Sequence, residues 1–278
     1  MTLPRIGVFD SGVGGLTVLR SMAEQMPAHY LYFGDTARLP YGTKSADTVA
    51  RYAIGAARFL ESQNIDLLVI ACNTATALAL PQIKQAARVP VIGVVEPGAA
   101  MAAEVSRSRS AIVIATEATV SSHAYRDALR QHGLEAHEKA CPLFVPLVEE
   151  GWIDHPVTEQ VARIYLGEAM AQSSGNADVL VLACTHYPLI APLLRRITPE
   201  HVKIVDSAES TARVVRRLLL ERSSHIESQG RASSSTGAPS DHRSFRFFVT
   251  DSVEKFKRLA TRFLGRQVDH VEHVDLGG

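Results

Sequence analysis

Cys72 and Cys184 are the residues of this 278-residue sequence whose type and setting best support acid–base chemistry. Each ends a short apolar run, NIDLLVIAC (64–72) and NADVLVLAC (176–184), and the runs match at six of nine positions at an offset of 112 residues. A free thiol has a pKa of roughly 8.5, so modest help makes it a usable base near neutrality. We expect each cysteine between a strand and a helix N-terminus, whose free N–H groups and dipole stabilise a thiolate.

The alternative interpretation is two inert core thiols, because cysteine is among the most frequently buried residues. The matched placement of Cys72 and Cys184, each followed within two residues by a threonine, favours a functional pair. Cys141, in KACPLF, has no such placement and is interpreted as structural. Three cysteines without metal-type spacing indicate reduced thiols and no metal site.

The elements that must position these thiols follow an alternating pattern. Continuous apolar runs predict strands buried on both faces of a parallel sheet: 6–10, 29–35, 66–72, 89–95, 111–116, 178–184 and 202–206, with FRFFVT (245–250) as one more. Helical patterns lie at Thr48–Gln63, Val157–Ala171 and Glu209–Arg222, and an amphipathic helix ends at Gly265. Strands that alternate with helices predict an α/β fold. A weaker second repeat sets IGVFDSG (6–12) against IVIATEA (112–118), at an offset of 106.

Polar residues gather at the predicted strand ends, where ligands bind in open α/β sheets. They are Asp10, Ser11, Cys72, Asn73, Thr74, Thr116, Cys184, Thr185 and His186. The segment DSGVGGLT (10–17) lets backbone N–H groups approach an anion, or is simply a tight turn; it fits no nucleotide-binding pattern. His186 and Asp10 could each assist a thiol or be hydrogen-bonded structural residues. Glu149 and Glu150, in PLVEEGW, are equally open between a role in the site and a solvated pair.

Composition excludes several classes of protein. With 29 Lys+Arg against 29 Asp+Glu, the chain has no general attraction for nucleic acid or anionic membranes. It has no apolar stretch of membrane-spanning length, and its start resembles no signal peptide, so we expect a cytoplasmic protein. Residues 223–244 are rich in Ser, Gly and polar side chains, which predicts a flexible surface loop inessential to catalysis.

Seven segments together resemble the bacterial glutamate racemases: DSGVGGLTVLR, YFGDTARLPYG, ACNTATALAL, GVVEPG, CPLFVPLVEEGW, LACTHYPLI and VDSAE. The resemblance runs from Ile6 to about Leu220 and includes the terminal strand and helix. One departure is ATEATVSS (115–122), where that family more often begins Gly-Thr, and another is the length of the Ser-rich segment.

The resemblance implies a site and an organisation. Cys72 and Cys184 would be the acid and the base, assisted by Asp10 and His186, with Glu149 matching a family glutamate. Substrate-binding positions would be Asp10, Ser11, Tyr41, Gly42, Asn73, Thr74, Thr116, Thr119, Thr185 and His186. Two similar parallel-sheet α/β domains would be related by a pseudo-twofold axis, 1–95 with 207–278 and 96–206, and the site would lie between them. It further implies a homodimer, D-glutamate supply for peptidoglycan and no cofactor. We expect no activation by a cell-wall nucleotide precursor, since the sequence lacks the N-terminal extension associated with it.

Two thiols suit racemisation, because a proton must leave one face of Cα and another must arrive on the opposite face. A pyridoxal mechanism would instead need a lysine Schiff base; the chain has six lysines, and only Lys44 stands beside a motif. The alternatives are the same chemistry on aspartate, a one-cysteine decarboxylase of the same superfamily, which the second cysteine disfavours, and a binding module without turnover. Exchange of solvent deuterium into the ligand separates the last from an enzyme.

Overall fold

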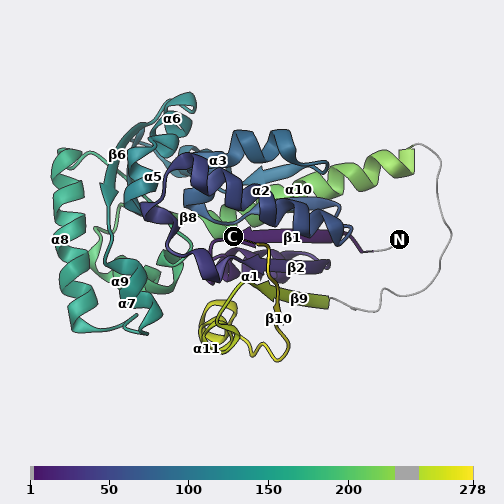
Figure 1. Ribbon diagram of the computed structural model, residues 1–278. Coiled ribbons are helices and arrows are strands. Elements are labelled where there is room, and N and C mark those ends of the chain that lie inside the picture. The colour runs from purple at the N-terminus through teal and green to yellow at the C-terminus, as the bar shows by residue number, and fades with distance from the viewer. Residues whose placement is uncertain (1–2, 229–243, 278) are drawn as a thin grey trace.

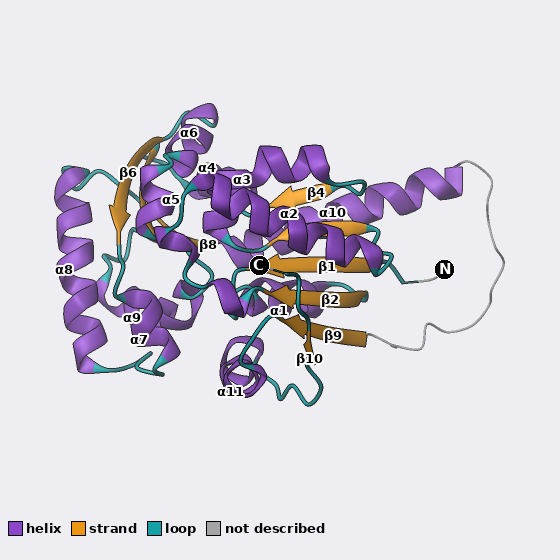
Figure 2. Cartoon of the chain, in the orientation of Figure 1, coloured by secondary structure: helices purple, strands orange, loops and turns teal. Residues whose placement is uncertain are grey.

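The computed structural model describes residues 3–228 and 244–277, which form two parallel sheets packed between helices (Figures 1 and 2). The first sheet contains β1 (Arg5–Asp10), β2 (His29–Gly34), β3 (Leu67–Ile70), β4 (Val91–Gly93), β9 (Ser244–Val249) and β10 (Glu272–His273). The second contains β5 (Ser110–Ala115), β6 (Glu135–Ala140), β7 (Val179–Ala183) and β8 (Lys203–Asp206). The predicted α/β class is confirmed.

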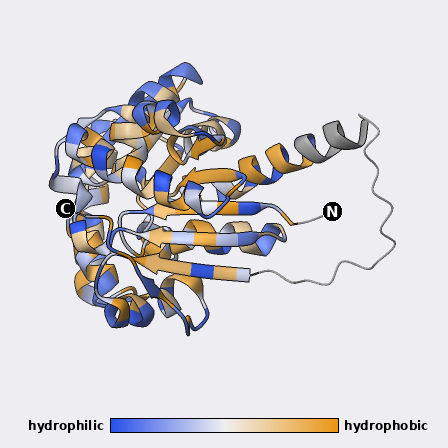
Figure 3. Ribbon diagram, turned by 45° about the vertical axis from the view of Figure 1, so that its right-hand side comes forward, coloured by the Kyte–Doolittle hydropathy of each residue, from blue (hydrophilic) through white to orange (hydrophobic). Residues whose placement is uncertain are grey.

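The helices connect these strands and cover the sheets. They are α1 (Leu16–Gln25), α2 (Ala46–Ser62), α3 (Asn73–Ala86), α4 (Val95–Val105), α5 (Glu117–Ser121), α6 (Ala124–Gln131), α7 (Phe144–Glu149), α8 (Pro156–Gln172), α9 (Ala191–Ile197), α10 (Ser207–Ser228) and α11 (Val253–Leu264). Three 3₁₀ turns, η1 (Thr36–Arg38), η2 (Tyr41–Thr43) and η3 (Tyr187–Ile190), complete the order. The central strands are mostly hydrophobic (Figure 3), because apolar side chains cover both faces of each sheet there.

Both sheets share one strand order, which confirms the repeat. The first runs β10-β9-β2-β1-β3-β4 and the second β6-β5-β7-β8, so β1 to β4 correspond to β5 to β8. The cysteine-bearing runs are the equivalent strands β3 and β7. The last segment returns to the first sheet, where β9 pairs with β2. The predicted domain limits at 95/96 and 206/207 stay a prediction; they fall at the starts of α4 and α10.

The strand register corrects the weaker repeat. Ile6 pairs with Leu67 in the first sheet, and Ala111 pairs with Val179 in the second. Since Leu67 and Val179 are equivalent at an offset of 112, Ile6 corresponds to Ala111, an offset of 105 rather than 106. A slip of one residue turns every side chain to the opposite face of a strand. The slip is invisible in the sequence because both faces of these strands are buried and apolar.

The aspartate shared by the two repeats has a structural role in each. Asp66 accepts a hydrogen bond from the backbone N–H of Arg5, at the start of β1 (Oδ2 to N, 2.8 Å). Asp178 accepts from the Ser106 hydroxyl (2.7 Å) and from the backbone N–H of Arg107 (2.6 Å), just before β5. Each carboxylate therefore fastens the segment that enters the central strand of its sheet.

Three expectations about elements were wrong. The strand β6, with the sequence EAHEKA, was missed because it is a polar edge strand that pairs only with β5. The strand expected at 89–95 ends at Gly93, since the chain turns directly into α4. The loop expected at 223–244 is wrong at both ends, because α10 continues to Ser228 and β9 begins at Ser244. Residues 229–243 lie outside the described residues.

No helix in the described part of the chain is long and apolar enough to cross a membrane. The Gly265 helix end was predicted correctly: α11 stops at Leu264, and Gly265 follows with a left-handed φ of 77°.

Asp178→Asn should destabilise the fold at neutral pH and lose its effect in acid. Burial opposes ionisation of Asp178, but bonds from Ser106, Ser108 and Arg107 lower its pKa to about 2. A folded pKa below the unfolded value means stabilisation that is full above about pH 4 and disappears as the pH falls toward 2. We expect a loss of about 2 kcal/mol at pH 7, typical of hydrogen bonds to a charged group. Thermal unfolding from pH 3 to 7 measures it.

The exposed Asp127→Asn serves as the control for that comparison and should leave the unfolding temperature unchanged. A deficit in Asp178→Asn that is the same at pH 3 as at pH 7 would contradict the role of the ionised carboxylate.

Candidate active site

A cavity of about 420 Å³ lies beyond the carboxyl ends of strands from both sheets. Such a volume suits a small-molecule ligand. Eleven of the residues singled out in the sequence line it: Ser11, Tyr41, Gly42, Cys72, Asn73, Thr74, Thr116, Glu149, Cys184, Thr185 and His186. The two cysteines therefore face one cavity, each contributed by one of the equivalent strands β3 and β7.

Asp10 and Thr119 lie behind the wall of the cavity. Asp10 is 1% exposed, and its Oδ2 accepts a hydrogen bond from the backbone N–H of Gly12 (2.9 Å). Burial raises the pKa of the Asp10 carboxyl, against the hydrogen bonds from the Gly12 and Gly15 backbone, which lower it. Thr119 is fully buried and contacts the site through the hydroxyls of Thr74 (3.2 Å) and Thr116 (2.9 Å).

Cys72 is the N-cap of α3, as the sequence predicts. Its Sγ accepts a hydrogen bond from the backbone N–H of Ala75 (3.4 Å) and donates one to the Ser11 hydroxyl (3.5 Å). The prediction that the helix N-terminus stabilises a thiolate at Cys72 was wrong, however. Burial and the neighbouring Asp10 carboxyl raise the pKa of the Cys72 thiol to about 12, outweighing the bonds from Ser11 and Ala75. Cys72 therefore carries its proton in the resting protein.

Cys184 has a different setting from its repeat partner. No α-helix begins directly after it; the chain makes a turn at Thr185 and His186 and enters the 3₁₀ turn η3. The predicted helix N-terminus is wrong here because Pro188 disfavours the α conformation at the residue before it and lacks an N–H. A histidine side chain takes the place of the helix N-terminus.

His186 supplies positive charge beside Cys184. Burial lowers the pKa of the His186 imidazole, but hydrogen bonds with Cys184 and Glu149 raise it by more, so that the pKa is about 10. Its Nε2 lies 3.2 Å from Glu149 Oε1, and the bond to His186 is the largest of the effects that lower the pKa of Glu149. His186 therefore places a positive charge between the Glu149 carboxylate and Cys184. The two cysteines thus have different neighbours: a buried carboxyl group beside Cys72 and an imidazolium beside Cys184.

The molecule has two halves, one built around the first sheet and one around the second, and side chains from both meet in the wall of the cavity. The hydroxyls of Thr74 and Thr116 are 3.0 Å apart, and the register that matches Ile6 with Ala111 also matches Ser11 with Thr116. Asn73 accepts a hydrogen bond from the Tyr125 hydroxyl (2.7 Å) and donates one to Ser207. These bonds tie the first turn of α3 to α6 through Tyr125 and to the start of α10 through Ser207.

Tyr41 lines the cavity, and its hydroxyl is engaged by a buried carboxylate. The hydroxyl donates to Asp35 Oδ2 (2.6 Å). Asp35 is fully buried, and its other oxygen accepts from Thr250 (2.9 Å). Asp35 belongs to the segment YFGDTARLPYG, but this role was not predicted from the sequence.

The sequence analysis missed several residues that line the cavity: Leu39, Pro40, Thr43, Glu117, Pro142, Val145, Pro146 and Lys255. Most of them lie within or beside the motifs quoted above, so their closeness in sequence to predicted site residues could have identified them. Lys255 is different, since it lies on α11, far along the chain from every motif. Its ammonium is 3.4 Å from Glu149 Oε2.

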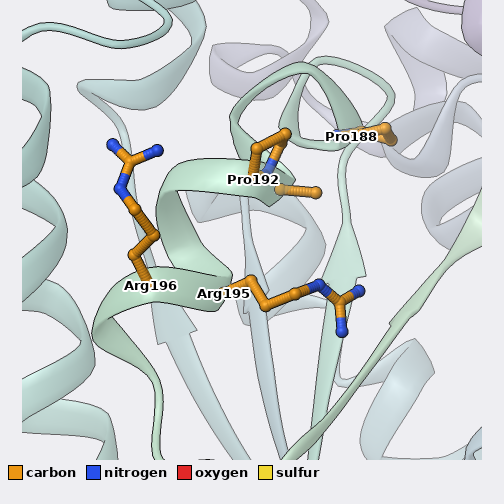
Figure 4. A pocket seen from close by; sticks show the side chains of 5 residues that line it. Pro188, Pro192, Arg195 and Arg196 are labelled. Atoms are coloured by element: carbon orange, nitrogen blue, oxygen red, sulfur yellow. The ribbon is translucent and has the colours of Figure 1, made fainter.

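A second hollow, of about 500 Å³, lies along η3 and α9 (Figure 4). It is lined by Pro188, Ala191, Pro192, Arg195 and Arg196, and the two arginines point in different directions. A guanidinium stays protonated in proteins, and proline has no titratable group, so this surface cannot exchange protons with a ligand. Within residues 3–228 and 244–277, no three His, Cys, Asp or Glu side chains gather as metal ligands would.

Comparisons with known proteins agree on one family. The Asp/Glu/Hydantoin racemase family model matches residues 6–215. The chain is 61% identical to a glutamate racemase of Koribacter versatilis, covering 99% of this chain and 98% of that one. Among solved structures, it is similar to the glutamate racemase of Francisella tularensis in complex with D-glutamate (TM-score 0.86, 34% identity, 99% of both chains). It is also similar to that of Thermus thermophilus in complex with β-chloro-D-alanine (TM-score 0.81, 42% identity, 98% and 97%).

Gly14→Ala should inactivate the site without unfolding the protein. A Cβ on Gly14 would lie 2.2 Å from Thr185 Oγ1 and 2.5 Å from His186 Nδ1, so both side chains must move. Displacing groups beside a reacting atom by about 1 Å costs on the order of a hundredfold in rate. Kinetics of proton exchange, with circular dichroism to verify folding, measure the loss.

Gly167→Ala in α8 is the matched control, because a Cβ there meets nothing within 4 Å. It should keep full activity. Retained activity in Gly14→Ala would show that the positions of Thr185 and His186 do not limit the reaction.

Proposed function

The chain belongs to the glutamate racemases of the Asp/Glu/Hydantoin racemase family, and we propose that it interconverts L- and D-glutamate by two-base proton transfer. One observation carries the proposal: Cys72 and Cys184, at the ends of equivalent strands, line the same cavity. Racemisation needs a base on one face of Cα and an acid on the other. Two thiols brought together by a repeated unit meet that need.

The proposed reaction uses the two thiols in turn. With L-glutamate, Cys184 acts as the base beside the His186 imidazolium and removes the Cα proton, and the Cys72 thiol delivers its own proton to the opposite face. The substrate leaves with inverted configuration, Cys184 now carries the proton, and Cys72 is the thiolate. The next substrate of the other hand reverses the transfer. The family resemblance assigns Cys72 to the D isomer, which leaves Cys184 as the base for L-glutamate.

The site also has to stabilise the negative charge that develops as the weakly acidic Cα–H ionises. The first N–H groups of α3, at Asn73 and Thr74, have no partner within the helix and stand at its positive end. A substrate carboxylate placed there would accept hydrogen bonds that strengthen as charge moves toward it. Ser11, Thr116 and Thr185 supply further hydroxyls around the substrate.

The biological setting follows from the same resemblance. We propose that the enzyme works in the cytoplasm as a homodimer and supplies D-glutamate for peptidoglycan, without a cofactor and without a nucleic-acid partner. Residues 1–95 with 207–278 would form one domain, and residues 96–206 the other.

Incubation with L-glutamate in D₂O tests the activity. We expect the D-glutamate formed at early times to carry deuterium at Cα, while unreacted L-glutamate keeps its proton, because different groups remove and deliver the proton. Proton NMR and optical rotation follow the two isomers. Faster turnover of aspartate would overturn the substrate, and no exchange at all would indicate a binding module.

The cysteine variants test the mechanism. Cys72→Ser and Cys184→Ser should each lose racemisation, because a hydroxyl is a far weaker acid and base than a thiol. Each keeps one thiol, so each should still eliminate chloride from one hand of β-chloroglutamate. In that reaction the thiolate takes the Cα proton, chloride leaves Cβ, and hydrolysis of the resulting enamine gives 2-oxoglutarate and ammonium. We expect opposite preferences, with Cys72→Ser handling the L and Cys184→Ser the D isomer.

Cys141→Ser is the control, since Cys141 is buried outside the cavity and should tolerate the change. The two-base mechanism is wrong if both active-site variants process the same hand, or if either racemises at the wild-type rate.

A further inference from the structure

The C-terminal helix α11 contacts the pair of side chains that serves Cys184. It follows β9, a strand of the first sheet, whereas Glu149 and His186 belong to the second half. In Figure 1, α11 lies beneath α1, on the side facing α7. Three of its residues reach across: Lys255, Arg262 and Phe263.

Arg262 holds the backbone of Glu149. Its Nη1 donates to the carbonyl oxygens of Val148 and Glu149, both at 3.0 Å. These carbonyls lie in the last turn of α7, where backbone acceptors lack partners within the helix and the dipole favours a cation. The guanidinium therefore caps α7 and fixes the residue that carries the carboxylate.

The residue at position 151 is a glycine, and this leaves space for the Arg262 side chain. The φ of +88° at Gly151 favours glycine, and a Cβ there would lie 2.6 Å from Arg262 Nη2. The glycine of the PLVEEGW motif thus leaves room for the guanidinium. The motif supplies both the carboxylate that meets His186 and the docking place for Arg262.

Phe263 contacts His186 and Lys255 contacts Glu149, and the first contact stabilises the pair more than the second. The Phe263 ring is fully buried and meets the His186 ring edge-on, with centroids 5.0 Å apart. It restricts the plane in which the imidazole points toward Glu149. The Lys255 side chain is 54% exposed, so its pair with Glu149 is screened by water and contributes less.

Cys72 is held by other means. Its Sγ bonds to Ser11 and to the backbone of Ala75, both in the first half. The contacts of Arg262 and Phe263 with Glu149 and His186 thus act on one thiol of the two.

We propose that Arg262 is a positioning residue for the Glu149–His186 pair, through which α11 governs proton transfer at Cys184 and not at Cys72. The proposal rests on the two-cysteine function, and it extends that function by giving the last helix of the chain a role in one half-reaction. The structure assigns Lys255 the same role with a smaller effect.

Arg262→Met in the full chain tests the proposal, with Arg258→Met as the matched control one turn earlier on the exposed face of α11. In Arg262→Met, elimination from the hand of β-chloroglutamate that Cys184 processes should fall tenfold or more, on the scale of a displaced catalytic group. Elimination from the other hand should stay within about twofold. Arg262→Lys, which keeps the charge and a donor, should recover part of the loss, and Arg258→Met should change neither hand.

A double variant and a spectroscopic readout separate positioning from general damage. Adding Arg262→Met to Glu149→Gln should cause no further loss, because both changes act on one pair. The nitrogen NMR signals of His186 should shift in Arg262→Met and stay unchanged in Arg258→Met. If Arg262→Met unfolds, Lys255→Met replaces it with Lys257→Met as control, and a several-fold loss in the same hand is expected.

Equal losses in both hands, or an unchanged His186 signal, would overturn the positioning role. Failure of the proposed function gives a different pattern: the wild type would not exchange the Cα proton of glutamate, or the two cysteine variants would share one preference. The NMR comparison still judges the role of Arg262 in that case, since it needs no turnover.

Discussion

The parallel pairing of β1 with β3 and of β5 with β7 is the constraint on which the rest of the site depends. Parallel strands end at the same edge of a sheet, so each sheet brings one cysteine and one hydroxyl residue, Ser11 or Thr116, to that edge. Two such edges facing one cavity place two thiols around a single ligand. Asp66 and Asp178, the aspartates common to both repeats, maintain this pairing by fastening the start of each central strand.

The repeat supplies two thiols, but it cannot by itself give them different surroundings. Racemisation needs one acid and one base at any moment, and identical surroundings would give both cysteines the same tendency to ionise. The difference comes from the residues just after each strand. Cys72 caps a helix, and its burial, together with the neighbouring Asp10, raises the pKa of its thiol. After Cys184 the chain enters a 3₁₀ turn that contains Pro188, and His186 is the charged neighbour of the thiol.

The sequence predicted the elements and residues whose burial gives an apolar pattern. It did not predict the features that depend on neighbours distant in the sequence. The central strands, the paired cysteines and the polar strand ends were predictable, since buried parallel strands have a strong apolar signature. The edge strand β6 resembles a polar loop, and β2, its equivalent, was found because β9 covers its other side. The raised pKa of Cys72 was not predictable, because it depends on burial and on Asp10, 62 residues away in sequence. Lys255 and Arg262 belong to no motif near Glu149.

The segments outside the repeat make contacts near the cavity that the repeat itself lacks. The strands β9 and β10 and the helix α11 have no equivalents in the second half, and neither sheet needs them to bring its cysteine to the edge. Yet α11 caps α7 and packs on His186. A duplicated unit thus provides geometry, two thiols facing one cavity, while an unduplicated helix contacts the neighbours of one of them. Symmetry in the strands and asymmetry in their covering are both required, because the reaction is symmetric over a full cycle and asymmetric at every step.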